Sequence, residues 1–132
     1  MLYRVAEDQG DYDLCKELAD SAGYDASEII FPTVMVFDDE DLIGFIGTLP
    51  KPDMILAGPL VMKPDRIRPF ALMKLVSAYD QVMANLNVKS YVFSTKKDSG
   101  FNRGIEHFLD HMDPYAQEGD ELFYVRNIEY GQ

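Results

Sequence analysis

The stretch LVMKPDRIRPFA at residues 60–71 joins an apolar run to a basic turn and then to the start of a predicted helix. The run from Met54 to Met62 is apolar and is interrupted only by Gly58-Pro59, which is typical of a buried strand. Beyond a break at Lys63-Pro64-Asp65, apolar residues recur at helical spacing as far as Asn87. The buried stripe of this helix comprises Leu72, Leu75, Val76, Tyr79, Val82, Met83 and Leu86.

This junction predicts an anion-binding site. A helix N-terminus presents unpaired N–H groups and the positive end of the helix dipole. Arg66 and Arg68 add two guanidinium groups, which suit phosphate oxygens, so the turn could hold a pyrophosphate. The alternative is that both arginines only solvate the helix start, where Pro69 suits the first turn.

A second apolar strand is predicted directly after the helix, from Val88 to Ser94. A strand, a long helix and another strand in succession imply one right-handed parallel crossover. Further along, a second helical stripe is followed by a closing strand over Leu122 to Val125. The stripe comprises Phe101, Ile105, Phe108, Leu109 and Met112.

The N-terminal third reads as strands joined by a tight turn. Short strands are predicted over Tyr3 to Ala6, Thr33 to Phe37 and Leu42 to Gly47. The acidic run Asp38-Asp39-Glu40-Asp41 between the last two is a hairpin turn, because four acids cannot be buried and Asp favours turns. It lacks the alternating ligands and the glycine of a calcium loop.

Two helices are predicted between the first two strands. The first starts at Asp11 as N-cap, runs to Ala22 and ends at Gly23 as C-cap. A short second helix is expected over Asp25 to Phe31, closed by Pro32. The whole order predicts an α+β fold: a mixed, mostly antiparallel sheet with one parallel crossover, flanked by helices, in one domain over residues 1–132.

The net charge of −11 is unevenly distributed along the 132 residues. Residues 1–50 contain 12 acids and 2 bases, residues 51–100 contain 4 acids and 8 bases, and residues 101–132 contain 7 acids and 2 bases. The basic middle segment can therefore host an anionic ligand, while the acidic remainder attracts cations. The alternative is that these charges only keep the protein soluble.

Several classes of protein are excluded or disfavoured by composition. The overall acidity argues against a nucleic-acid binder, and no apolar run is long enough for a membrane span. The start of the chain lacks a signal-peptide pattern, so we expect a cytoplasmic location, or a virion if the chain derives from a phage. The only cysteine, Cys15, excludes an internal disulfide.

The order of elements resembles the GNAT superfamily of acyl-CoA-dependent N-acyltransferases over nearly the whole chain. Tyr3 to Asp8 looks like the first strand of that family, and the acidic hairpin looks like its second and third strands. Leu60 to Asp65 looks like the end of its fourth strand. Arg66 to Ala71 falls on the family's phosphate motif, Gln/Arg-x-x-Gly-x-Gly/Ala, and Asn102 matches a common asparagine that contacts the cofactor or a neighbouring strand.

The resemblance implies acetyl-CoA as cofactor and an amine as acceptor. The backbone of Leu60, Val61 and Met62 would pair with the pantetheine amides. Arg66, Arg68, Phe70 and Ala71 would hold the pyrophosphate, with Asn102 nearby. The fourth and fifth strands would splay to admit the thioester, and the slot would have to be free of Phe70, Tyr91 and Phe93. The acidic N-terminal third would lie near the incoming amine.

Three departures from the family pattern concern cofactor binding and catalysis. Pro69 replaces the first glycine of the motif and has no N–H to donate. Leu109 stands where the family often has a tyrosine that protonates the leaving thiolate. The fourth strand contains no Asp or Glu as general base, and Tyr115, His107 and His111 are the candidate substitutes.

Two functions therefore remain open. One is an acetyl-CoA-dependent N-acyltransferase acting on a small amine or a protein amine. The other is a catalytically degenerate GNAT-fold structural or interaction protein that binds a protein partner, because short acidic GNAT-like proteins occur among tailed-phage virion and accessory components. His107 and His111 are four residues apart, but nothing supplies further ligands, so no metal is expected. Lys96-Lys97 could contact the 3′-phosphate of CoA or be a plain solvated loop.

Overall fold

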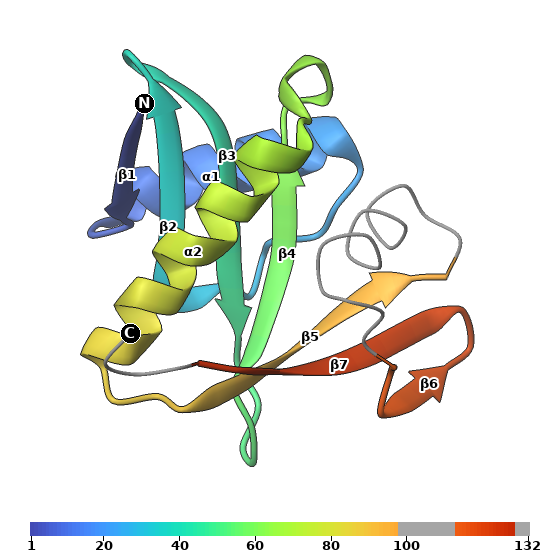
Figure 1. The fold of residues 1–132 in the computed structure, drawn as a ribbon. Helices are drawn as coiled ribbons and strands as arrows, with labels where there is room; N and C mark the ends of the chain where they lie inside the picture. Colours follow the sequence, from blue (N-terminus) through green and yellow to red (C-terminus); the bar gives the residue numbers. More distant parts are fainter. Residues whose placement is uncertain (98–112, 129–132) are drawn as a thin grey trace.

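The computed structural model describes residues 1–97 and 113–128, which include a seven-stranded sheet of order β1-β2-β3-β4-β5-β7-β6 (Figure 1). Its strands are β1 (Leu2–Val5), β2 (Ile30–Asp38), β3 (Asp41–Leu49), β4 (Leu56–Met62), β5 (Ser90–Lys96), β6 (Ala116–Glu118) and β7 (Glu121–Asn127). The helices of the described residues are α1 (Gln9–Ala22), the short 3-10 helix η1 (Pro64–Arg66) and α2 (Pro69–Asn85).

The pairing of the strands confirms the predicted mixed sheet. β1 to β4 pair antiparallel in chain order, and β5, β7 and β6 also pair antiparallel. Between these two groups β4 and β5 are parallel, because α2 returns the chain to the end of the sheet at which β4 begins. The acidic residues Asp38–Asp41 form the β2–β3 turn, as expected, with Asp38 opposite Asp41.

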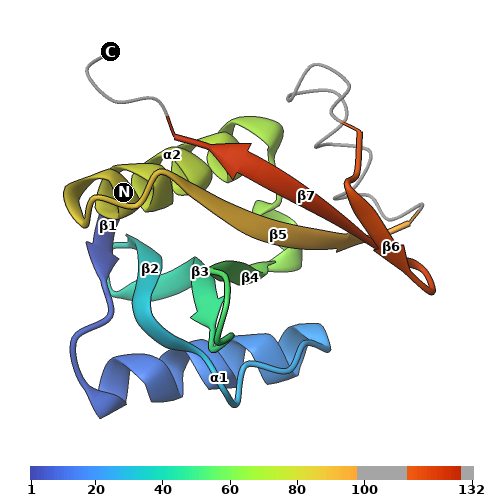
Figure 2. The same ribbon diagram turned by 90° about the horizontal axis from the view of Figure 1, so that it is seen from below.

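The two helices lie on opposite faces of the sheet (Figure 2). Successive side chains of a strand point to opposite faces of the sheet, so one strand can pack against both helices. In β2, Val34 belongs to the buried cluster under α2, whereas its neighbour Met35 belongs to the buried cluster under α1. Cys15 is buried in the α1 cluster, and burial raises the pKa of its thiol to about 12. It acts as a small apolar side chain in the core.

The start of α1 differs from the prediction. Asp8, not Asp11, is the N-cap, and its carboxylate accepts a hydrogen bond from the Asp11 N–H at 2.9 Å. Asp11 lies inside the helix, and its carboxylate accepts two hydrogen bonds of 2.7 Å from the Arg4 guanidinium instead of capping the helix. The predicted C-cap Gly23 is confirmed, with a left-handed φ of 83°.

The short helix expected over Asp25 to Phe31 is wrong. Asp25 instead accepts hydrogen bonds from the backbone N–H and the hydroxyl of Ser27, and β2 begins at Ile30. Pro32 does not end an element but lies within β2. The register between Ile30 and Val34 is irregular, and this irregularity accommodates a residue that has no N–H to donate.

Other boundaries moved by a few residues. The predicted long helix is η1 followed by α2, and the strand expected from Val88 extends from Ser90 to Lys96. β6 was not predicted, because three residues are too few to show a period. The apolar stripe over 101–112, including Asn102, His107, Leu109 and His111, lies outside the described residues.

Candidate cofactor-binding site

The two parallel strands at the centre of the sheet separate soon after they meet. β4 and β5 pair only at Leu56 opposite Val92 and Ala57 opposite Phe93, close to the hydrogen bond of 2.8 Å from the Val92 N–H to the Ile55 carbonyl. Beyond this point β4 continues toward η1 while β5 follows β7, and Figure 1 shows the two strands diverging. The predicted splay is therefore present.

The separation begins at Gly58-Pro59. Pro59 has no N–H for a ladder, and Gly58 has a φ of 144°, a conformation that residues with a Cβ rarely adopt. The sequence signal was the same dipeptide, read as an interruption of an apolar strand. Its consequence is that the edge of β4 from Leu60 to Met62 is not paired with β5.

The direction of the peptide groups identifies which of these residues face the gap. The Lys63 N–H donates to the Ile43 carbonyl of β3 at 2.9 Å. Successive residues of a strand point their peptide groups to opposite edges, so Val61 also faces β3. The N–H and C=O groups of Leu60 and Met62 face the β5 side, and these are the ones that an extended amide chain could pair with.

The first turn of α2 stands directly after this edge of β4 and η1. Leu72 is the first residue of α2 whose N–H donates to the carbonyl four residues earlier, that of Arg68, at 3.0 Å. The N–H groups of Phe70 and Ala71 precede it and point out of the helix start, whereas Pro69 has none. Two of the predicted phosphate-binding amides are thus present at the helix terminus.

The two arginines of the turn differ in their surroundings. Arg66 donates to the carboxylate of Asp38 in the β2–β3 turn, and this guanidinium holds the pKa of Asp38 below its usual range. Arg68 is exposed and donates only to the carbonyl of its neighbour Ile67 among the hydrogen bonds of the described residues. Arg68 is therefore the more available cation, a distinction that the sequence could not make.

Two of the three side chains named as obstacles to a slot, Phe70 and Tyr91, have other positions. Phe70 is 70% exposed, and Tyr91, at the closed end of the gap, donates to Asp80 of α2 at 2.7 Å. Phe93 is the last residue of β5 that pairs with β4, and its ring stacks on Tyr124 with the ring centroids 5.3 Å apart. Neither Phe70 nor Tyr91 occupies the space between the diverging strands.

Among the described residues, few groups that could move a proton lie near this gap. Of the three predicted candidates only Tyr115 is described, and it is exposed, with its backbone N–H bonded to the Phe123 carbonyl. Tyr79 and Tyr91 are buried tyrosines that the sequence did not suggest as proton donors or acceptors, and burial raises the pKa of each. Tyr79 shares a hydrogen bond with Thr48 and Tyr91 donates to Asp80, so both are structural groups of the core.

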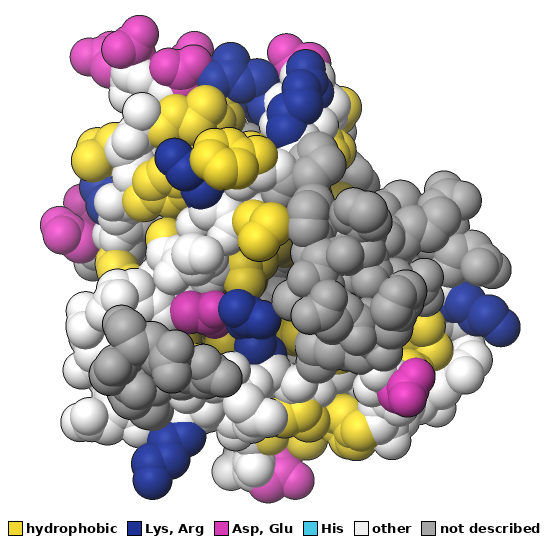
Figure 3. All heavy atoms as spheres, viewed as in Figure 1, with side chains coloured by type: hydrophobic (Ala, Val, Ile, Leu, Met, Phe, Trp, Pro, Cys, Tyr) yellow, Lys and Arg dark blue, Asp and Glu magenta, His cyan; other side chains and the backbone are white. Residues whose placement is uncertain are grey.

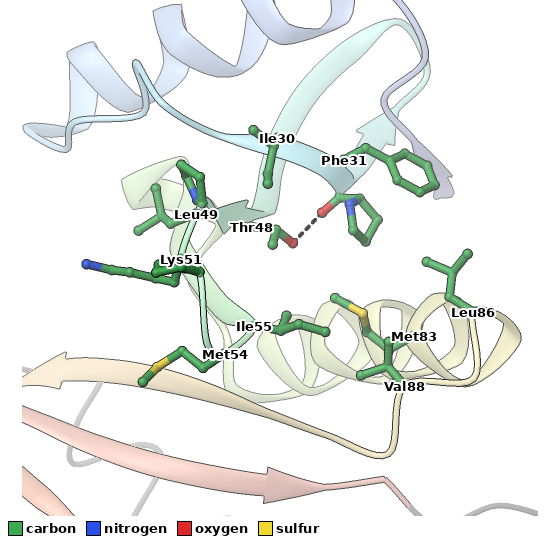
Figure 4. Close-up of a pocket in the computed structure, with 13 residues that line it drawn as sticks. Ile30, Phe31, Thr48, Leu49, Lys51, Met54, Ile55, Met83, Leu86 and Val88 are labelled. Atoms are coloured by element: carbon green, nitrogen blue, oxygen red, sulfur yellow. Dashed lines mark hydrogen bonds between the residues drawn. The ribbon is translucent and has the colours of Figure 1, made fainter.

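A hollow of about 600 Å³ lies at the C-terminal end of α2, away from the β4–β5 gap (Figure 4). It is lined mostly by apolar side chains from the start of β2, the β3–β4 loop and the end of α2, and Lys51 is the one charged residue among the described residues that line it. The Thr48 hydroxyl at its floor donates to the Pro32 carbonyl at 2.6 Å. Behind Thr48, Tyr79 is fully buried, shares a hydrogen bond with Thr48 and contacts the Tyr91 ring edge-on.

Two further observations bear on binding. In the part of the chain that the structure describes, no group of three or more His, Cys, Asp or Glu side chains could hold a metal ion. No helix among the same residues is long and apolar enough to cross a membrane.

Comparison with known proteins gives a fold. The sequence matches no protein-family model and no curated protein sequence. The structure is similar to an aminoglycoside 6′-N-acetyltransferase complexed with coenzyme A, at a TM-score of 0.70 and 16% identity over 98% of each chain. A PaiA N-acetyltransferase from Thermoplasma acidophilum, in complex with coenzyme A, gives 0.71 and 12% over 96% of this chain and 99% of that one.

A third similar structure is the ribosomal-protein-S18-alanine N-acetyltransferase from Escherichia coli, with a TM-score of 0.67 and 9% identity over 99% of this chain and 97% of that one. A putative acetyltransferase of the GNAT family from Desulfovibrio desulfuricans gives 0.71 and 12% over 97% and 99%. These proteins have different acceptors in their names but one arrangement of strands and helices. The chain has the fold of the GNAT N-acetyltransferases.

Proposed function

We propose that this protein binds an acyl-CoA between β4 and β5 and transfers the acyl group to an amine. The observation that carries the proposal is the separation of β4 from β5 after Ala57, directly below the N-terminus of α2. Within the described residues, that separation leaves an unpaired strand edge beside unpaired helix N–H groups. An amide-containing chain that ends in a pyrophosphate has the complementary chemistry for both.

The residues fit the two ends of CoA as follows. The peptide groups of Leu60 and Met62 would pair with the pantetheine amides, and the N–H groups of Phe70 and Ala71 would receive the pyrophosphate. Arg68 adds a guanidinium that is not committed to an ion pair within the described residues. Pro69 removes one donor from the turn, so the remaining two amides and Arg68 would hold the anion.

Bound acyl-CoA supplies a thioester, on which a neutral amine forms a C–N bond while the C–S bond breaks and the thiolate leaves. The proton lost by the amine must reach water or a nearby base. β4 contains no carboxylate, and a missing general acid or base slows such a transfer by roughly 10²–10⁴-fold rather than abolishing it. The acidic N-terminal third, with 12 acids and 2 bases in residues 1–50, favours the approach of a cationic amine.

A second candidate function is a non-catalytic protein with the same fold, such as a virion or accessory component. The observation that favours it is the pair between Arg66 and Asp38, which removes one of the two motif arginines from the site. Pro69 in the place of a glycine points the same way. On this alternative the gap would bind no acyl-CoA and a protein partner would take its place.

Thermal unfolding with acetyl-CoA separates the two functions. A ligand present at 100 times its Kd adds about 2.7 kcal/mol to the free energy of unfolding. We expect the melting temperature to rise with acetyl-CoA, and free CoA thiol to appear when an amine acceptor is added. An unchanged melting temperature at millimolar acetyl-CoA would exclude the acyltransferase function.

A further inference from the structure

The start of α2 carries an exposed apolar group that the proposed contacts do not use. Phe70 is 70% exposed, and its neighbours Ile67 and Met73 are 50% and 44% exposed. A single exposed apolar side chain needs no explanation, but three close together at a candidate site indicate a binding surface. Figure 3 shows hydrophobic and basic side chains lying together over this part of the molecule.

The charge around Phe70 is positive in an otherwise acidic protein. Residues 63–74 contain four bases and one acid, against a net charge of −11 for the chain. Asp38 neutralises Arg66, but Arg68 and Lys74 take no part in the ion pairs of the described residues. The Lys74 ammonium lies 4.8 Å from the centroid of the Phe70 ring, over one of its faces.

A ring with a cation on one face and solvent around it has the chemistry to bind a flat, anionic ligand. The free face can stack on a nucleobase, because every base presents a π-face to an aromatic side chain. Arg68 and Lys74, two residues before and four residues after Phe70, can then meet a phosphate attached to the same nucleoside.

We infer that Phe70, Arg68 and Lys74 form a platform for the 3′-phosphoadenosine part of CoA, which rests on the proposed acyl-CoA function. Phe70 stacks on the adenine, and Lys74 pairs with the 3′-phosphate. The platform distinguishes CoA from donors that end at phosphopantetheine. It also compensates for the amide donor that Pro69 lacks, because it adds contacts outside the pyrophosphate turn.

The test is the affinity of the wild type and two variants for CoA, 3′-dephospho-CoA and phosphopantetheine, measured by calorimetric titration. Phe70→Ala should weaken CoA binding about 5- to 150-fold, since stacking of one base is worth about 1–3 kcal/mol, and should leave phosphopantetheine binding unchanged. Lys74→Gln should weaken CoA binding but not 3′-dephospho-CoA binding. Phe31→Ala and Lys51→Gln, at the distant hollow, are matched controls and should bind all three ligands like the wild type.

Three outcomes would overturn the platform while leaving the proposed function intact. The first is equal CoA affinity for the wild type and Phe70→Ala. The second is loss of discrimination against 3′-dephospho-CoA in Lys97→Gln instead of Lys74→Gln, which would assign the phosphate to the end of β5. The third is unchanged CoA affinity in Phe70→Ala together with reduced binding to phosphatidylserine vesicles, which would make the patch a membrane surface. Failure of the wild type to bind either CoA or phosphopantetheine would instead contradict the proposed function.

Discussion

The carboxylate of Asp11 forms a partly buried ion pair with Arg4 instead of capping the first helix. It is 7% exposed, and its two oxygens accept hydrogen bonds from both terminal nitrogens of Arg4 and from the Glu7 N–H. These contacts lower the pKa of Asp11 to about 2, with the Arg4 hydrogen bonds as the largest cause. The pair joins β1 to the start of α1.

Replacing Asp11 with Asn should lower the free energy of unfolding by about 2 kcal/mol at neutral pH, because hydrogen bonds to a charged group are worth about 1.5–3 kcal/mol. The pKa is lower in the folded protein than the ordinary value of 3.8, so the stabilisation is complete above that value and is lost as the pH falls toward 2. Urea denaturation from pH 7 to pH 2 should therefore show the variant and the wild type converging in acid.

Asp13→Asn is the matched control, since Asp13 is exposed and accepts a hydrogen bond only from Gln9 among the hydrogen bonds of the described residues. It should change stability by less than about 0.5 kcal/mol. Equal effects of Asp11→Asn and Asp13→Asn would contradict the structural role assigned to Asp11.

Residue identity alone could predict the basic turn but not the partners of its side chains. Arg66 and Arg68 are equivalent in the sequence, yet one is paired with Asp38 of a distant hairpin and the other is exposed. The same holds for Asp8 and Asp11, which are both acceptable N-caps by residue type. Contacts between residues far apart in the chain decided both cases.

At the scale of elements, the N-terminus of α2 begins with a residue that is unfavourable for the helix. Arg68 is the N-cap residue, and its side chain makes no capping hydrogen bond, so the helix start is left without the partner that Ser, Thr, Asp or Asn would provide. A positive side chain here also opposes the helix dipole. A residue that weakens its own helix is consistent with selection for an anionic ligand.

Arg68→Asp should therefore have opposite effects on folding and on binding. The new carboxylate caps the helix and should raise the free energy of unfolding by about 1 kcal/mol. It also places a negative charge beside the proposed pyrophosphate position, so CoA affinity should fall at least tenfold. Urea denaturation and calorimetric titration on one preparation measure both quantities.

Arg68→Gln separates charge removal from capping, because it loses the cation without gaining a good N-cap. Its CoA affinity should lie between those of the wild type and Arg68→Asp, with little change in stability. If Arg68→Asp bound CoA as tightly as the wild type, the pyrophosphate would not lie at the start of α2.

Elements with a clear hydrophobic period were predictable, and elements shaped by irregular backbone were not. The strands around the acidic hairpin and the long helix α2 follow from alternation and helical spacing. Residues 25–31 resemble a helix by composition, but the pairing of Ile30 with Thr48 places the last two of them in β2 and leaves the rest as a turn. Tertiary pairing there outweighs local preference.

At the scale of the whole molecule, the sheet consists of two antiparallel groups joined by a narrow parallel contact. Only two residue pairs link β4 to β5. A polar network on α2 adds a second connection: Asp80 accepts hydrogen bonds from Tyr91 of β5 at 2.7 Å and from Arg126 of β7 at 2.8 Å. The gap that would hold the cofactor thus lies between two groups of strands that are also connected through α2.

A double-mutant cycle tests this connection. Asp80→Asn and Arg126→Met should each destabilise the protein, and the double variant should lose less than the sum of the two, with a coupling of about 1–2 kcal/mol. The matched cycle of Asp38→Asn and Arg66→Met concerns a pair that is more exposed to solvent and should show a smaller coupling. Equal coupling in both cycles would mean that the α2 network does not hold the two groups of strands together.

The central claim, that CoA binds between β4 and the start of α2, is tested most directly by backbone amide NMR during titration with CoA. We predict the largest shift changes at the N–H groups of Leu60, Met62, Phe70 and Ala71, with smaller changes at Thr48 and Leu86 around the distant hollow. Changes concentrated at Thr48 and Leu86, or no changes at saturating CoA, would contradict the account.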